Sequence, residues 1–178
     1  MEPREEERAF RDQIFLISLV NSPESNQNRT FLLLSATVIG PTELNLLLNE
    51  IEQRVGSEWS WTSCAHFMVE CLFIVKDRLP PLALDGLAIA QLYLAGCSSS
   101  QEVSNMRVRC WQELPGELSM KTDDPRVAAI RAVICVLQTS LESSEGLDLL
   151  SFFLQLVNRI EPHYEAQYRL LSKHFDVA

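Results

Sequence analysis

Cysteine and histidine are the side chains in this sequence best suited to nucleophilic or metal chemistry. The chain has five cysteines and three histidines. Cys64, His66 and Cys71 fall within one expected helix, where they project in different directions. Because structural zinc sites draw paired ligands from two segments at short spacings, this pattern favours buried thiols beside a histidine over a metal site.

His163 and His174 fall in the last expected helix, and their charged neighbours place them on an exposed polar face. A cysteine nucleophile needs a histidine close to it in space, but the two residues can be far apart in the sequence. The sequence neither supports nor excludes such a pair. A cysteine-dependent enzyme therefore stays open as the less favoured alternative.

Other catalytic and nucleotide-binding signatures are missing. The chain contains no Gly-rich phosphate loop, no Gly-x-Ser-x-Gly and no His-Glu-x-x-His motif. Asp123 and Asp124 form a carboxylate pair, but Pro125 follows directly, so helix capping explains them better than acid–base catalysis. We predict that the protein is not an enzyme and holds neither a cofactor nor a metal.

The tryptophans suggest binding rather than catalysis. Trp59 and Trp61 flank a single serine in a short connection, and tryptophan is enriched among residues that dominate protein interfaces. We take both as candidate protein-binding residues, against the equally weighted alternative that the rings pack into the core. Trp111, beside Cys110, is expected in the core.

The composition predicts an all-α fold. Of 178 residues, 47% are hydrophobic and 22% are charged, which is enough apolar surface for a folded core. The chain has only 6 glycines and 8 prolines, too few for the many turns of a β-sandwich. We predict a compact multi-helix domain of roughly eight to nine helices, occupying residues 1–178 as a single domain.

Hydrophobic spacing and helix stop signals place the expected helices along the chain. The run 31–39 is so continuously apolar that it also fits a buried strand, although we expect a helix. The helix at 82–95, which Gly96 is expected to end, is apolar on nearly all sides and is the candidate for the central element of the fold. The expected helices cover about residues 5–20, 30–39, 42–55, 62–78, 82–95, 103–111, 124–141, 144–157 and 162–175.

Polar residues and proline mark several helix starts. Thr42 is the expected N-cap of one helix, and Thr62 or Ser63 of another. The clearest start is Asp123 or Asp124 followed by Pro125 at the first helical position.

Charge and targeting signals restrict the partners and the compartment. The formal net charge of −9 disfavours direct binding of nucleic acid. A charged N-terminus and the lack of an apolar run of about 18 residues predict no membrane span. An odd number of cysteines without a secretory signal predicts an intracellular protein, cytoplasmic or nuclear.

Two resemblances to known families bear on the fold. The segment 124–133, which is proline-initiated and alanine-rich, resembles the first helix of a HEAT or armadillo-like repeat. That resemblance implies protein binding along a stacked helical surface. Trp59-Ser60-Trp61 leading into 65–75 resembles the entry to the central helix of Bcl-2-like regulators, but the Asn-Trp-Gly-Arg sequence and the hydrophobic C-terminal tail are missing.

These observations favour a non-catalytic protein–protein interaction module, or a scaffold or adaptor subunit of a larger intracellular complex. Its protein partner is expected to use an apolar helical face or a groove. The alternatives are a Bcl-2-like regulator that binds amphipathic helices and, less favoured, the cysteine-dependent enzyme.

Overall fold

The computed structural model describes residues 39–55, 60–114, 124–139 and 143–177. The chain divides into two units, Met1–Thr37 and Val38–Ala178, and all described residues lie in the second. They form seven α-helices and no strand. The predicted all-α class is confirmed for this part of the chain. The helix expected at 5–20 and all but the last residue of the one expected at 30–39 lie outside the described residues, so a single domain over 1–178 stays a prediction.

Each of the seven expected helices that fall in the described part matches one observed helix. The helices are α2 (Pro41–Val55), α3 (Trp61–Ile74), α4 (Pro81–Leu94), α5 (Ser100–Glu113), α6 (Pro125–Val136), α7 (Ser143–Ile160) and α8 (Tyr164–Phe175), with a short 3-10 helix at Lys76–Arg78 between α3 and α4.

Two helix starts follow from local side-chain chemistry. Asp124 caps α6, because its carboxylate accepts a hydrogen bond of 2.8 Å from the backbone N–H of Arg126, and Pro125 follows as predicted. Ser99 and Glu102 form a reciprocal capping box at the start of α5. These side chains satisfy backbone N–H groups that the first helical turn leaves unpaired.

Two other starts differ from the prediction. α3 is capped by Ser60, whose hydroxyl accepts from the backbone N–H of Ser63 at 3.4 Å, rather than by Thr62 or Ser63. α2 begins at Pro41, one residue before the Thr42 that was predicted to cap it. Proline has no N–H to leave unpaired and a backbone angle suited to a helix, so it starts the helix.

Helix ends were harder to place. Gly96, with φ of 72°, ends α4 as predicted. α6 ends at Val136, five residues before the predicted end at 141. The apolar pattern continues beyond this point, but Gln138 has already left the helix and accepts a hydrogen bond from Arg107 of α5 at 2.5 Å.

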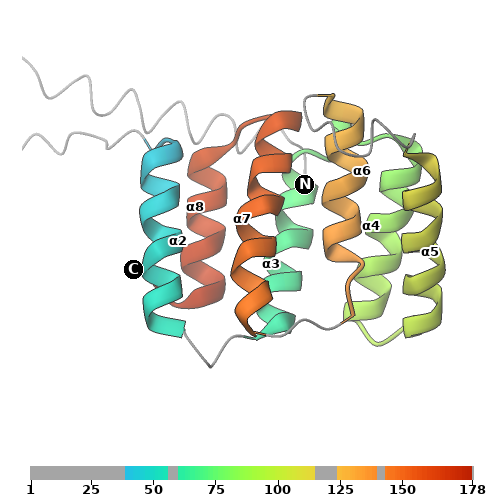
Figure 1. The fold of residues 1–178 in the computed structure, drawn as a ribbon, viewed down its shortest axis with the longest axis horizontal. Helices are drawn as coiled ribbons and strands as arrows, with labels where there is room; N and C mark the ends of the chain where they lie inside the picture. The colour runs from blue at the N-terminus through green and yellow to red at the C-terminus, as the bar shows by residue number, and fades with distance from the viewer. Residues whose placement is uncertain (1–38, 56–59, 115–123, 140–142, 178) are drawn as a thin grey trace, which may run out of the picture. The chain divides into compact units, whose positions relative to one another are not determined.

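The helices of this unit run side by side, from α2 at one end to α5 at the other (Figure 1). α6 and α7 pack closely together, and both pack against α3. α4 and α5 pack on the α6 side, whereas α8 packs on α3 and supports α2. The helices far apart in sequence, such as α2 and α8, are therefore direct neighbours.

The prediction that the helix at 82–95 is the central element is wrong. α4 buries only Ala83, Gly86, Leu87 and Ala90 and leaves Leu92 46% exposed. α6 is the most enclosed helix, with nine of its twelve residues buried. Its small alanines allow neighbouring helices to approach from several sides, which an apolar composition alone does not reveal.

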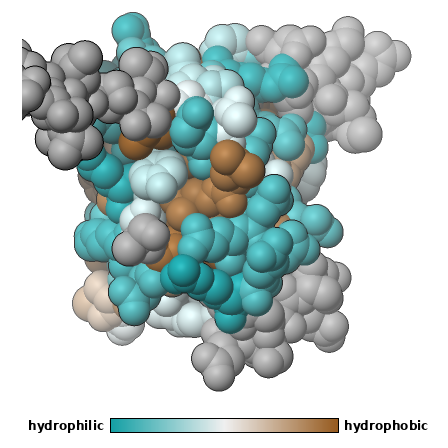
Figure 2. Space-filling view, turned by 90° about the vertical axis from the view of Figure 1, so that its left-hand side faces the viewer, coloured by the Kyte–Doolittle hydropathy of each residue, from teal (hydrophilic) through white to brown (hydrophobic). Residues whose placement is uncertain are grey.

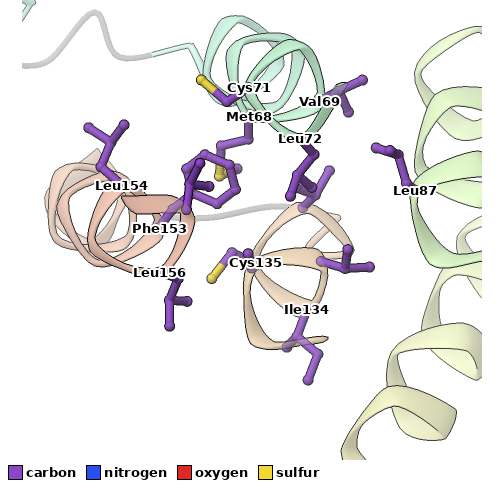
Figure 3. Close-up of a cluster of buried hydrophobic side chains, with 14 of the residues drawn as sticks. Met68, Val69, Cys71, Leu72, Leu87, Ile134, Cys135, Phe153, Leu154 and Leu156 are labelled. Carbon is purple, nitrogen blue, oxygen red and sulfur yellow. The ribbon is translucent and has the colours of Figure 1, made fainter. Parts of the chain in front are cut away.

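The core lies between α3, α6 and α7. Met68, Cys135 and Phe153 point toward one another from these three helices (Figure 3). Phe67 meets Phe153 edge to face, with ring centroids 6.4 Å apart. All four side chains are buried, so this cluster holds the three helices in register.

Candidate protein-binding groove

Four of the five cysteines are buried and have raised pKa values. Burial raises the pKa of Cys64 to about 12, with a smaller effect from Cys135. Burial likewise raises the pKa of Cys135 to about 12 and that of Cys110 to about 11. Cys71 is shifted in the same direction by burial. Since the thiolate is the nucleophilic form, these environments disfavour nucleophilic chemistry.

The remaining polar chemistry is sparse in the described part of the chain. Cys97 is exposed just after α4, where its thiol lies 3.6 Å from the carbonyl oxygen of Ala95. Within the ranges described, no group of three or more His, Cys, Asp or Glu side chains is placed to hold a metal ion. None of the observed helices is long and apolar enough to cross a membrane.

His174 is not on an exposed polar face, contrary to the prediction. Its side chain is 13% exposed, and its ring packs edge to face against Phe67 with centroids 6.3 Å apart. Its Nε2 lies at the ion-pair distance of 3.1 Å from Glu70 Oε1. α8 therefore turns this histidine inward, toward α3.

Glu70 forms the polar link between α3 and α8. Both of its carboxylate oxygens accept hydrogen bonds from Lys173 Nζ, at 3.0 and 2.9 Å. Partial burial raises the pKa of this carboxyl group, but the Lys173 hydrogen bonds and the charges of His174 and Lys173 outweigh it and lower the pKa. This cluster anchors α8, and we assign it no catalytic role.

The tryptophans occupy different environments. Trp59 lies outside the described residues. Trp61 is the first residue of α3, half-buried and packed against the core; its predicted role in partner binding stays a prediction. Trp111 was predicted in the core and this is wrong, because it is 47% exposed. Because consecutive residues of a helix point about 100° apart, Cys110 faces the core and Trp111 does not.

A groove runs between α2 and α7. Its larger section has a volume of about 470 Å³ and lies between residues 41–48 of α2 and 151–159 of α7, with Tyr164 of α8 at its edge. A second section of about 230 Å³ continues between residues 45–52 and 147–151. Both sections share Leu48, so they form one continuous groove. The pairing also shows that α2 and α7 run antiparallel along it.

The groove exists because α2 packs mainly on α8 and scarcely touches α7. Leu44, Leu47 and Ile51 are buried and hold α2 in place. Leu48 is half-buried at the edge of this apolar stripe and lines both sections of the groove. Leu46, which is 63% exposed, lines neither section. One side of α2 thus faces the core and another faces the groove.

The lining combines apolar and polar side chains. Leu48, Leu147 and Leu154 supply apolar surface, and Asn158 contributes an amide. The Asn158 side-chain oxygen accepts a hydrogen bond of 2.9 Å from Gln167 Nε2. Gln167 is completely buried, so this hydrogen bond stabilises one wall of the groove from behind.

Charged lining residues lie at the two ends of the groove. Glu52 and Asp148 belong to its narrower section. Arg159 belongs to the wider section, at the end where Tyr164 lies. Two carboxylate residues thus line one end of the groove, and one arginine lines the other.

Hydrophobic residues gather in a patch bordered by hydrophilic ones on the side of the molecule where α2 lies (Figure 2). No local sequence pattern predicts the groove, because its two walls are about one hundred positions apart in the chain. The one local feature that hints at the groove is Leu48. It makes the apolar stripe of α2 wider than packing against a single neighbouring helix requires.

Known proteins supply no assignment. The chain matches no protein-family model, and neither curated proteins nor solved structures give a significant match.

Proposed function

We propose that this protein is a non-catalytic interaction module that receives a helix of a partner protein in the groove between α2 and α7. The observation that carries the proposal is the continuous groove itself, about 470 and 230 Å³ in its two sections. α2 and α7 are antiparallel, and the packing of α2 on α8 keeps them apart. The space between them is the position that a further helix would occupy in a helical bundle.

The dimensions and chemistry of the groove suit a short amphipathic helix. Its lining extends over residues 41–52 of α2, which corresponds to about 16 Å, or three helical turns. A helix of this length places apolar anchors at positions i, i+3 or i+4 and i+7 along one face. Leu48, at the centre of the groove, is the natural contact for the middle anchor.

The arrangement of the other helices supports a scaffold or adaptor role inside the cell. Side-by-side antiparallel packing, of the kind found in HEAT and armadillo-like proteins, presents helix faces to partners while the core stays closed. We include that likeness in packing as part of the proposal. The partner then completes a helical layer rather than entering an active site.

The two alternatives receive less support. The Bcl-2 resemblance would make α3 the central helix enclosed by the others, but α3 exposes Thr62, His66 and Phe73 on one face, and the most enclosed of the described helices is α6. A cysteine-dependent enzyme requires an accessible thiolate. The four thiols with raised pKa values do not favour that chemistry.

The test compares two leucines of the same helix. Tagged wild-type protein, Leu48→Arg and Leu46→Arg are purified from native cells, and co-purifying proteins are quantified by mass spectrometry. Leu48 lines the groove and Leu46 does not, whereas both substitutions add the same charge to α2. We expect a stoichiometric partner to be lost with Leu48→Arg and kept with Leu46→Arg.

A second measurement locates the contact. Hydrogen exchange of the complex should protect α2 and α7, and the bound segment of the partner should gain helical protection. Retention of every partner by the Leu48→Arg protein, when its melting temperature matches wild type, would falsify the proposal. If binding is instead lost with Trp59→Ala alone, the interface lies at the tryptophan connection and not in the groove.

A further inference from the structure

We infer that the groove binds its partner helix in one direction, with the first turn of that helix at Glu52 and Asp148 and its last turn at Asn158 and Tyr164. This inference rests on the proposed function and specifies the direction and the terminal chemistry of the bound helix. A helix bound in this way runs antiparallel to α2 and parallel to α7. The direction follows from the groups that line the two ends of the groove.

The two ends of a helix differ chemically, whatever its sequence. The first turn leaves backbone N–H groups unpaired and carries a partial positive charge, whereas the last turn leaves carbonyl oxygens unpaired and carries a partial negative charge. A groove with negative charge at one end, and with donors or positive charge at the other, therefore binds a helix more tightly in one direction than in the reverse direction.

The narrower section of the groove offers acceptors and negative charge. Glu52 of α2 and Asp148 of α7 line it from opposite walls, and both residues are exposed. Neither carboxylate has a hydrogen-bond or ion-pair partner among the described residues. Because α2 ends and α7 begins at this end, their dipoles offset each other. The two carboxylates therefore decide the sign of the charge here, and they favour the first turn of a bound helix.

The wider section offers donors and positive charge. Asn158 lines it, and its side-chain oxygen already accepts the hydrogen bond from the buried Gln167, so its amide N–H groups are the donors left for a partner. The dipoles of α2 and α7 offset each other at this end as well. α8 begins here, at Tyr164, and adds the positive end of a third helix dipole. Both features favour the unpaired carbonyl oxygens of a last turn.

Two other charged residues lie at or beside the wider section. Arg159 lines it but already takes part in an interaction within the chain. Glu165, in the first turn of α8, accepts a hydrogen bond from Arg169 and lines neither section of the groove. The proposed direction depends on neither charge.

The direction also restricts the sequence of the partner. The first turn of a helix commonly carries Asp or Glu, because a negative charge suits the positive end of the dipole. In the groove these side chains would meet Glu52 and Asp148, and like charges repel. We therefore expect the bound helix to begin with uncharged or basic residues.

The first experiment locates the two ends of a bound helix. Peptides of about 14 residues, or four helical turns, are selected by phage display on the full chain, with the Leu48→Arg protein as counter-selection. They are apolar on one face and uncharged elsewhere. A synthetic selected peptide with both termini blocked then carries a photo-crosslinker in its first or its last turn. We expect crosslinks from the first turn to the segments that contain Glu52 and Asp148, and from the last turn to residues 158–164.

The second experiment tests the carboxylates of the narrower section. The selected peptide is prepared with an acetyl or a succinyl group on its N-terminus, and the succinyl group adds a negative charge. We expect the succinylated peptide to bind the wild-type protein about threefold more weakly, by fluorescence anisotropy. The double variant Glu52→Gln/Asp148→Asn should abolish or reverse this difference. Asp77→Asn/Asp85→Asn removes the same charge outside the groove lining and should keep it. A difference that survives in the first variant contradicts the inference.

The third experiment tests the donors of the wider section. Asn158→Asp retains an oxygen that accepts from Gln167 but replaces the N–H donors with negative charge, so the blocked peptide should bind about fivefold more weakly. Gln155→Glu is the matched control, because it adds the same charge to the same wall three residues earlier. It should weaken binding less. Equal losses in the two variants, at wild-type melting temperatures, would show that Asn158 does not hold the last turn.

The outcomes separate the two proposals. If the selected peptides bind in the reverse direction, or in both directions, the inferred direction is wrong and groove binding stands. If no peptide distinguishes wild type from Leu48→Arg, groove binding itself fails, and the inferred direction falls with it.

Discussion

The two sides of α7 differ in how tightly they are packed. On its inner side, Phe153 is completely buried between α3 and α6. On its outer side, Gln155 and Ser151 line a groove that no described helix fills. Core packing tolerates little change, because interiors are as dense as molecular crystals. We therefore expect substitutions on the groove side to destabilise the protein less than substitutions on the inner side, as the proposed binding surface requires.

The largest difference is expected between Phe153→Ala and Gln155→Ala. The first removes a buried ring and leaves a cavity, so it should lower the free energy of unfolding by about 3–5 kcal/mol. The second trims an exposed side chain and should stay within about 0.5 kcal/mol of wild type. Urea denaturation of both variants measures the contrast. Equal losses would show that the two sides of α7 do not differ in packing as the structure indicates.

The next largest effect is expected in the packed core, at the contact between α4 and α6. A Cβ atom added to Gly86 would lie 2.5 Å from the Cγ1 methyl group of Val133. Val133 is buried, and its β-branched side chain has one strongly preferred rotamer in a helix. Gly86→Ala should therefore cost about 1–3 kcal/mol by overpacking, even though alanine favours the helix by about 1 kcal/mol. Thermal denaturation provides the measurement.

Val133→Ala serves as the rescue in this experiment. It removes the methyl group that the new Cβ would meet, so the double variant should be less destabilised than the sum of the single variants. Additive losses would place the cost of Gly86→Ala elsewhere than at this contact.

Local sequence features predicted much of the fold. Asp124 with Pro125 located the start of α6, and Gly96 located the end of α4, because both effects depend on neighbouring backbone groups. The central position of α6 was not predicted, since it depends on which helices pack around it. The inward turn of His174 was missed for the same reason, because its surroundings come from α3.

The candidate site was less predictable than the fold. Residue type pointed to Trp59 and Trp61, but a groove is the space that two helices leave between them. Leu48 and Ser151 face that space from positions distant in the chain, and helical periodicity shows only that each lies on a helix. The gap itself results from how α8 holds α2, which no local pattern encodes.

A smaller effect is expected at the start of α6. Asp124→Ala removes the acceptor for the backbone N–H of Arg126 and should cost about 1 kcal/mol of stability. Asp124→Asn retains a side-chain oxygen and should recover most of this loss. Chemical denaturation compares the three proteins. If Asp124→Asn is as unstable as Asp124→Ala, the stabilisation comes from the negative charge of Asp124 and not from its capping hydrogen bond.

The smallest effect concerns Glu70, through which α3 holds α8 and so supports α2. The lowered pKa of this carboxyl group means that its contribution to stability is complete above its ordinary value of 4.5 and is lost as pH falls through the lower native value. Because the group is partly exposed, Glu70→Gln should cost only about 0.2–1 kcal/mol at pH 7. The difference from wild type, measured by urea denaturation, should disappear as the pH is lowered through the native pKa and should shrink in high salt. A loss that persists unchanged at low pH would show that packing of the Glu70 side chain, and not its charge, joins α3 to α8.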